Sequence, residues 1–472
     1  MTRLPCILRM IFFALFAGPI IGLLTPAGSL ADIAGMKRAI VDYNTRIHKA
    51  SLLEDTYRGE EGILMMKPDV ARSFNLSVPE YPDYEKGKAL FKKAEKVLDK
   101  TIKIMEIQVN NRGFRKKHIS QIADLAVFYN KTIKLAREKL SEYRSKLDPK
   151  LDERLDPKIC TALLEILLEE SLREKSRNLR DSLGHFYNLC HGIDKKKYPL
   201  TAENVLFVNF VFNEEKSRIR ETSGNKYDMD TQNIVNKDML KPGWRSDLSG
   251  DESRFLRVIE SELQKREKTN SQVDALLFLA LIKQESRFDP KDVSRVGAAG
   301  LTQIMPGTGK KLGMTHIFSP PYYEEAGTLL AKERSSRGKA IRIIYEIKEE
   351  NKLELAKKAM VLMGQSLDYK KRRKILFTRY ARELRDSGKD ERLDPFKSIK
   401  YGLEYFSSLM TLQNGDISLA LASYNAGPHR VKKYKGLPPF SETVGFRNRV
   451  LVYYKEYLEK LEKYKLKKSK GR

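Results

Sequence analysis

The side chain best suited to chemistry in this sequence is Glu285, near the end of an almost wholly apolar stretch that begins at Asp274. Phe278 and Leu281 precede it by seven and four residues, so the three side chains share one face of a predicted helix. Apolar surroundings and the negative end of a helix dipole both favour the neutral form of a carboxyl group. The pattern therefore predicts a proton donor, a general acid, at position 285.

A second interpretation of Glu285 needs no catalysis. In it, the carboxylate lies at a partly exposed helix end and pairs with Lys283 or Arg287. Pro290 ends the helix in either case, because proline cannot continue a helix and disfavours helical geometry in the residue before it. The residues after Pro290 are what favour the catalytic interpretation.

A loop rich in small residues follows the predicted helix. Gly297 and Gly300 bracket two alanines, with Ser294 before them and Gln303 after them. Small residues let the backbone approach another molecule closely, and the Gln303 amide both donates and accepts hydrogen bonds. Sugar hydroxyls and amides suit such a wall, so the stretch favours a carbohydrate site.

Three motifs, in order along the chain, resemble the signatures of a known family. They are ESRFDPKDVSRVGAAGLTQIMPGTGKKLG at 285–313, LALASYNAGPHRV at 419–431 and LPPFSETVGFRNRVL at 437–451. The family is that of the lytic transglycosylases with the soluble-transglycosylase fold, glycoside hydrolase family 23, which are related to goose-type lysozymes. The resemblance extends over roughly 250–315 and 394–460, less than half of the chain.

The resemblance implies a peptidoglycan lytic transglycosylase. Glu285 would protonate the glycosidic oxygen of the β-1,4 bond between N-acetylmuramic acid and N-acetylglucosamine. It would then act as base while the muramyl C6 hydroxyl closes a 1,6-anhydro ring. The residues that the resemblance assigns to substrate binding are Ser294, Gln303, Met305, Tyr424, Asn425 and Glu442. The sequence contains no cofactor or metal motif, and the implied partner is the peptidoglycan glycan strand.

Two other functions stay open. One is a hydrolytic muramidase of goose-lysozyme type, which uses water and normally needs a second carboxylate. Asp289 is one turn beyond Glu285, but a polar residue beside the helix-ending Pro290 is expected for backbone reasons alone. The other function is a catalytically idle scaffold that binds the wall.

The chain departs from the family pattern in three places. Thr302 stands where the family usually has methionine, and Phe446-Arg447 where it more often has Tyr-Val. A helical, basic insertion of about 75 residues, roughly 319–393, interrupts the domain and contains the cluster Lys370–Lys374. Long insertions are usually functional or flexible, so this one could be a cleft wall, a lid, a docking element or a passive helix pair.

The sequence as a whole predicts a mainly α-helical protein, with a lysozyme-like catalytic domain at the C-terminus and an α-helical N-terminal domain before it. Val205–Phe212 is rich in strand-forming residues, yet the helix-start pattern from Thr201 favours a buried helix. No internal repeat is predicted. The predicted parts are a signal peptide at 1–31, the N-terminal domain at 32–220, a linker at 221–250 with the only tryptophan, Trp244, the catalytic domain at 251–465 and a basic tail at 466–472.

The first residues predict export. Arg3 and Arg9 precede an uncharged apolar run, Met10 to Leu24, and small residues lead up to Ala31. This is the pattern of a signal peptide cut near that residue. We therefore expect a periplasmic protein of the cell envelope. Removal of the signal peptide takes away two arginines and no acidic residue, and it lowers the net charge from +27 to +25. Such a charge suits an anionic wall or membrane surface, or it reflects solvated helix faces; nucleic acid is not an expected partner.

Two cysteines remain in the mature chain, Cys160 and Cys190. An oxidising compartment permits a disulfide between them if the helical pattern folds back between the two positions. One continuous helix would instead hold them far apart. The sequence leaves both arrangements open.

Overall fold

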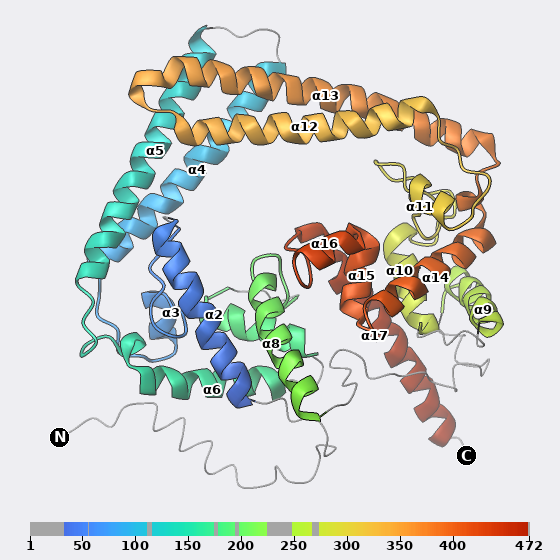
Figure 1. Ribbon diagram of the computed structural model, residues 1–472, viewed down its shortest axis with the longest axis horizontal. Helices are drawn as coiled ribbons and strands as arrows, with labels where there is room; N and C mark the ends of the chain where they lie inside the picture. The colour runs from blue at the N-terminus through green and yellow to red at the C-terminus, as the bar shows by residue number, and fades with distance from the viewer. Residues whose placement is uncertain are drawn as a thin grey trace. The chain divides into compact units, whose positions relative to one another are not determined.

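The computed structural model describes residues 33–54, 56–110, 116–173, 178–193, 198–223, 248–266 and 273–470 (Figure 1). These residues form α-helices joined by turns and loops, and none of them belongs to a β-strand. The prediction of a mainly α-helical protein is confirmed. The predicted signal peptide and Trp244 lie outside the described residues. Within the described residues, no helix is both long enough and apolar enough to cross a membrane.

The chain divides into two compact units that are interleaved in sequence. Unit 1 comprises the described residues of Met1–Ala89, Leu135–Asp230 and Lys433–Val444, and unit 2 those of Leu90–Lys134, Thr231–Lys432 and Gly445–Arg472. Each unit is described by itself below.

The described part of unit 1 contains five helices and the ends of two longer ones. Its helices are α2 (Ile33–Leu53), α3 (Pro68–Ser73), α6 (Pro157–Arg173), α7 (Leu179–Cys190) and α8 (Val205–Ser223), with the first turns of α4 (Pro82–Asn110), the last turns of α5 (Lys116–Ser145) and the 3-10 turn η1 (Glu153–Leu155). The helix predicted from Val205 is confirmed as the start of α8, and Phe207, Val208 and Val211 are buried there.

One loop from the C-terminal part of the chain belongs to unit 1 and is held by two asparagines of α8. The Asn209 side chain donates to the Leu437 carbonyl at 2.8 Å and accepts from the Leu437 N–H at 3.0 Å. Asn213 donates to the Lys435 carbonyl at 2.7 Å. The buried Asn209 side chain thus pairs both backbone groups of Leu437 through its amide nitrogen and oxygen.

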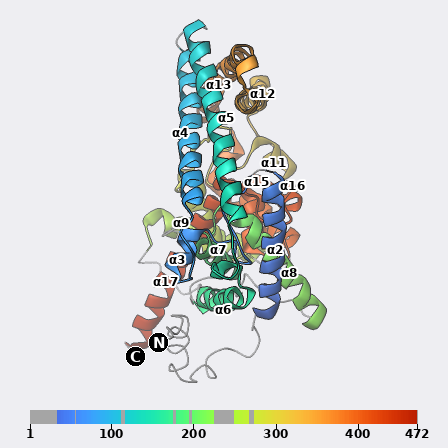
Figure 2. The same cartoon turned by 90° about the vertical axis from the view of Figure 1, so that its left-hand side faces the viewer.

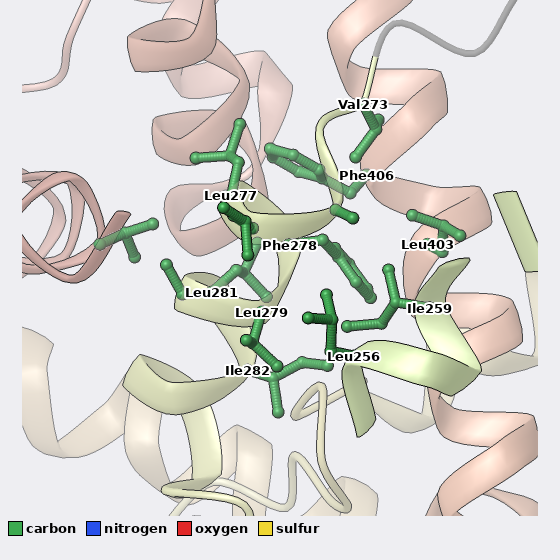
Figure 3. Close-up of a cluster of buried hydrophobic side chains, with 14 of the residues drawn as sticks. Leu256, Ile259, Val273, Leu277, Phe278, Leu279, Leu281, Ile282, Leu403 and Phe406 are labelled. Carbon is green, nitrogen blue, oxygen red and sulfur yellow. The ribbon is translucent and has the colours of Figure 1, made fainter. Parts of the chain in front are cut away.

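The helices of unit 2 pack in two main apolar clusters, one around α10 and one between α12, α13 and the outer turns of α4 and α5. The helices that follow α4 and α5 in this unit are α9 (Gly250–Lys265), α10 (Ala275–Ser286), α11 (Pro306–Lys311), α12 (Pro321–Glu346), α13 (Lys352–Ser387), α14 (Pro395–Leu412), α15 (Ile417–Ala426), α16 (Pro428–Lys433) and most of α17 (Ser441–Lys470). Figure 3 shows Leu277, Phe278 and Leu281 of α10 surrounded by apolar side chains of neighbouring helices. Leu256 and Ile259 come from α9, and Leu403 and Phe406 from α14.

The predicted insertion at 319–393 consists mainly of the antiparallel helices α12 and α13. Within unit 2 these two helices pack on the outer turns of α4 and α5, where Met105, Ile122 and Ala126 share a buried cluster with Ile344 and Met360. Figures 1 and 2 show this crossing of the two helix pairs. The Asn130 side chain donates to the carbonyl groups that end α12, at 2.9 Å each. One face of the insertion is therefore buried within the protein.

Cys160 and Cys190 lie on the neighbouring helices α6 and α7, and both are buried free thiols. Burial raises the pKa of the Cys160 thiol to about 12 and that of Cys190 further still. Of the two arrangements left open by the sequence, the chain thus folds back, without a disulfide between the sulfur atoms.

Candidate active site

Helix α10 places Glu285, and its sequence explains why it forms there. Asp274 caps the helix by accepting hydrogen bonds from the Leu276 and Leu277 N–H groups, at 2.7 and 3.0 Å. Every residue from Ala275 to Ile282 is buried, so the helix is apolar on all sides and runs through the core. Glu285, one residue before its end, is half-buried.

The end of α10 is abrupt. Arg287 and Phe288 both have a positive φ, 52° and 69°, in the left-handed region that is unfavourable for residues with a Cβ. The Arg287 N–H closes the helix on the Lys283 carbonyl, and the Phe288 ring stacks on Phe255 with centroids 6.0 Å apart. The chain turns away directly after Ser286, which leaves the Glu285 carboxyl at the boundary of the core.

Residues on either side of Glu285 are anchored to other helices of unit 2. Lys283 donates to a carboxylate oxygen of Glu252 at 3.0 Å, and Gln284 accepts from the guanidinium of Arg449 at 2.9 Å. The Tyr457 hydroxyl donates to the same Glu252 oxygen at 2.8 Å. These contacts hold the last turn of α10 against α9 and α17.

Tyr424 lies close to Glu285. It stands in the last turn of α15 and donates its hydroxyl proton to the Thr302 carbonyl at 2.7 Å. Burial raises the pKa of Tyr424 well above its ordinary value, and the nearby Glu285 carboxylate adds to that rise. The tyrosine is therefore a neutral hydrogen-bond donor between the acid and the glycine-rich loop. Its ring packs against Tyr405 and Phe406.

The loop between α10 and α11 is held in shape by its own polar side chains. The Ser294 hydroxyl accepts from the Ala298 N–H at 2.9 Å, and the Gln303 amide donates to the carbonyl groups of Asp292 and Gly300 at 3.1 and 3.0 Å. Gln303 itself has a positive φ of 46°. Two of the residues predicted to bind sugar thus also build the wall on which a sugar would rest.

A buried arginine that the sequence reasoning missed supports this loop. Arg392 is fully buried, is paired with Asp390, and donates to the carbonyl groups of Gly297 and Ile304 at 3.0 and 3.2 Å. It also donates to the Tyr380 hydroxyl at 2.7 Å. Its contacts reach residues 88 and 95 positions earlier in the chain, so no local pattern indicates them.

The other predicted substrate-binding residues have different settings. Met305 caps α11 and is 37% exposed, and Asn425 is half-buried directly after Tyr424. Glu442 is exposed in the first turn of α17, within the segment Lys433–Val444 that belongs to unit 1. The structure therefore brings together Glu285, Tyr424 and the loop of Gln303 in unit 2, whereas Glu442 is described with unit 1.

The departures from the family pattern are buried positions. Thr302 is fully buried and bonds through its hydroxyl to the Ser398 carbonyl at 3.0 Å. Phe446 belongs to the apolar core around α10, and Arg447 is buried with its Nε bonded to the Ser418 hydroxyl at 3.0 Å. At these three positions the side chains serve packing and internal hydrogen bonds.

A family model for the transglycosylase SLT domain matches residues 262–329 and 375–443. The two matched segments end and resume within α12 and α13, where the helix pair interrupts the domain. The chain therefore carries a transglycosylase SLT domain, the domain of the lytic transglycosylases.

Curated relatives match part of the chain. The soluble lytic murein transglycosylase of Escherichia coli (strain K12) is 26% identical over 218 residues, 43% of this chain and 23% of that protein. The transglycosylase of Enterobacteria phage PRD1 is 37% identical over 65 residues, 14% of this chain and 24% of that protein. The chain spans about a quarter of the length of these relatives.

A solved structure, the inactive mutant of lytic transglycosylase Slt from Pseudomonas aeruginosa, aligns with 98% of this chain and 76% of its own. The sequence identity is 16% and the TM-score is 0.26. A likeness this low carries no weight for the arrangement of the present chain.

Proposed function

We propose that this protein is a peptidoglycan lytic transglycosylase in which Glu285 acts first as general acid and then as general base. One observation carries the proposal. Within residues that match the SLT domain, a half-buried glutamate lies at the end of a helix whose first eight residues are apolar and buried, and it lies close to the neutral hydroxyl of Tyr424. A general acid needs such a desolvated carboxyl group beside fixed donors.

The reaction would proceed in two proton transfers. Glu285 donates its proton to the glycosidic oxygen between N-acetylmuramic acid and N-acetylglucosamine, and the bond from that oxygen to the muramyl C1 breaks. The muramyl C6 hydroxyl then attacks C1 and returns its proton to Glu285, which regenerates the acid. The products are a shortened strand and a 1,6-anhydromuramyl end, and no water is consumed.

The substrate would lie along the loop of Ser294 and Gln303, with Met305 beside it. The exposed thioether of Met305 offers an apolar contact to a sugar face, and the amide of Asn425 offers a polar one. We also assign Glu442 to substrate binding, from its place in the third motif. Tyr424 orients the site by holding the Thr302 carbonyl close to Glu285.

Hydrolysis by water is the second candidate, and one observation bears on it. Asp289, the neighbouring carboxylate in sequence, is exposed and accepts a hydrogen bond from the Lys291 N–H at 2.8 Å. That is the setting of a turn residue, and a single acid suits a reaction in which the substrate supplies its own nucleophile. The idle-scaffold alternative predicts wall binding without any product.

The test compares the full mature chain with Glu285→Gln on purified sacculi, with products analysed by mass. We expect anhydromuramyl ends from the wild type and a loss of about 10²–10⁴-fold or more in Glu285→Gln. Glu459→Gln, the same change at an exposed position of α17, is the control and should retain activity. Reducing muramic ends would identify a hydrolase, and an inactive wild type would refute the enzymatic function.

The same proposal includes the setting of the enzyme. We place the catalytic domain at 251–465, after an N-terminal domain and linker, and propose export to the periplasm with cleavage near Ala31 and an anionic wall or membrane surface as the neighbour of the basic faces. Mass analysis of the protein from a periplasmic fraction checks the cleavage site. An unprocessed chain starting at Met1 would contradict it.

A further inference from the structure

Two loops in different units share one backbone conformation. Each loop contains three residues of positive φ, and a fourth follows the next short helix, at the same spacing in both units. These residues are Gly59, Gly62, Met65 and Asn75 in unit 1, and Gly297, Gly300, Gln303 and Gly313 in unit 2. An antiparallel bridge closes each loop, between Glu61 and Met66 and between Ala299 and Ile304. A left-handed residue other than glycine is uncommon, so the pairing of Met65 with Gln303 is a specific likeness.

The same hexapeptide supports both loops. Asp-Glu-Arg-Leu-Asp-Pro occurs at 152–157 and again at 390–395, and in each place it forms a 3-10 turn followed by a helix. The buried arginines Arg154 and Arg392 each donate from Nε to the aspartate two residues earlier, at 2.9 Å in both cases. Each also donates from Nη2 to a buried tyrosine hydroxyl, Tyr143 or Tyr380, at 2.7 Å in both cases.

The two arginines reach the same two points of their loops. Arg154 bonds to the carbonyl groups of Gly59 and Met66, as Arg392 does to those of Gly297 and Ile304. A Cβ on Gly62 would collide with the Arg154 carbonyl oxygen, and a Cβ on Gly300 with that of Arg392. The close approach of glycine to arginine backbone is thus also common to both units.

The order of elements agrees along the whole length. Both series have the same order of elements: a helix, the loop, a short helix beginning with proline, a long helix pair, the 3-10 turn and three further helices. The series are α2, α3, α4–α5, η1, α6, α7, α8 and α10, α11, α12–α13, η6 (Glu391–Leu393), α14, α15, α17, with α16 added in the second. The prediction that the chain has no internal repeat was therefore wrong, and the helix pair α12–α13 has a counterpart in α4–α5.

The unit 1 series lacks the acid. Helix α2 contains no glutamate. Tyr187, in the last turns of α7, occupies the position of Tyr424, and each is followed by an asparagine. Burial raises the pKa of both tyrosines. Nearby groups raise it further: Tyr43, Glu60 and Glu203 act on Tyr187, and Glu285 acts on Tyr424. At the constant offset of 238 residues that relates the two loops and the two arginines, the position of Glu285 is taken in α2 by Ile47, an apolar residue.

Aromatic rings fill the region beside Tyr43. Helix α2 packs on α8, where the Tyr43 ring lies 5.3 Å from Phe207 and 5.4 Å from Phe210. The Tyr187 ring lies 5.2 Å from Phe207. The wall residue Gln303 is replaced by Met65, which is buried. Apolar Ile47 and Met65 thus stand at the positions of Glu285 and Gln303.

We propose that unit 1 is a second copy of the transglycosylase core that has lost its acid and filled its cleft, so that one chain carries two copies and one reaction site. The inference rests on the proposed function for the identity of that site. We call each loop with its buried arginine and tyrosine a frame. The likeness of the two frames does not depend on the proposed function, because it rests on the loops and arginines alone.

The first experiment counts the sites. The full mature chain carrying Glu285→Gln is titrated with a purified tetrasaccharide of alternating N-acetylglucosamine and N-acetylmuramic acid. Amide hydrogen exchange then locates the residues that the tetrasaccharide protects. We expect one tetrasaccharide per chain, slower exchange in 297–304 and no change in 59–66 or 187–191. Two tetrasaccharides per chain, protection of 59–66, or cleavage by folded Glu285→Gln within about tenfold of the wild-type rate would overturn the inference. An inactive wild type would instead overturn the proposed function.

A pair of matched variants tests the frames without substrate. Tyr143→Phe and Tyr380→Phe each remove the hydroxyl that accepts from the buried arginine, with little change of shape. Each should speed amide exchange about tenfold in its own loop, 59–66 or 297–304, and not in the other. Turnover should fall in Tyr380→Phe and stay within about twofold in Tyr143→Phe. Unchanged exchange at 59–66 in Tyr143→Phe would refute the shared frame.

Discussion

At the scale of single residues, the acid depends on neighbours that hold the last turn of α10. Glu252 is the centre of these contacts, because its carboxylate accepts from Lys283, from Tyr457 and from the Ser249 N–H. Burial alone would raise the pKa of Glu252, but the hydrogen bonds from Ser249, Tyr457 and Lys283 lower it to about 2. The ionised form is therefore the one that the fold stabilises.

The first prediction concerns the pH dependence of that contribution. Since the pKa of Glu252 is lower in the folded than in the unfolded state, its stabilisation is present above about pH 4.5 and is lost as the pH falls towards 2. Urea unfolding should find Glu252→Gln less stable than the wild type by about 1–3 kcal/mol at pH 6, and the gap should close towards pH 3.

The control for Glu252 is Glu459→Gln, an exposed glutamate on the same helix as Tyr457. Its stability should differ little from that of the wild type at any pH. If the difference in the free energy of unfolding between the wild type and Glu252→Gln stayed constant from pH 6 to 3, the ionised carboxylate would contribute nothing to stability.

At the scale of elements, the loop between α10 and α11 depends on glycine where backbone passes close to backbone. Gly300 has a φ of 79°, and its Cα lies against the Arg392 carbonyl, so that position has neither the conformation nor the space for a side chain. Gln303 in the same loop also has a left-handed φ, and the buried Arg392 holds the loop through hydrogen bonds to its carbonyl groups.

The second prediction is that Gly300→Ala destabilises the protein by about 2 kcal/mol or more, through the left-handed conformation and the collision with Arg392. Gly307→Ala is the matched control, because Gly307 lies in α11 with open space around the added Cβ. Alanine there should be neutral or stabilising by up to about 1 kcal/mol. Thermal unfolding checks both, and equal losses would show that the contact with Arg392 is unimportant.

At the scale of the whole chain, the two units exchange segments of sequence. Residues 433–444 join α16 to α17 of the catalytic part, yet they pack with unit 1 through α8. Asn209 satisfies both backbone groups of Leu437, which is fully buried. Folding of this loop is thus tied to residues more than 220 positions earlier.

The third prediction follows from that tie. Asn209→Ala leaves a buried N–H and a buried carbonyl unpaired, so it should lower the free energy of unfolding by about 2–4 kcal/mol and speed exchange of the Leu437 amide. Asn213→Ala, which removes an exposed hydrogen bond to Lys435, should change stability by less than about 1 kcal/mol. Equal effects of the two variants would contradict the role of burial at Asn209.

The helices, and the prediction of Glu285 as the acid, came from local sequence. The spacing of Phe278, Leu281 and Glu285 predicted the apolar helix, and Pro290 its end, because helix periodicity and proline act within a few residues. The start pattern at Thr201 was enough to identify α8 despite its strand-like composition. The roles assigned to Ser294, Met305, Asn425 and Glu442 stay predictions, since their test is a bound sugar.

Only the tertiary structure showed which side chains support the turn that carries Glu285, and that the loop with its buried arginine occurs in both units. The hexapeptide at 152–157 and 390–395 was present in the sequence, but its meaning depends on hydrogen bonds that span about 90 residues. Side-chain identity around the two frames has diverged, as Met65 and Gln303 show, while backbone conformation has not. Sequence patterns report local preference, whereas a buried arginine and the rings around Tyr43 are chosen by packing across the fold. For that reason the sequence was enough to predict Glu285 as the acid, whereas the second copy proposed in unit 1 could be inferred only from the structure.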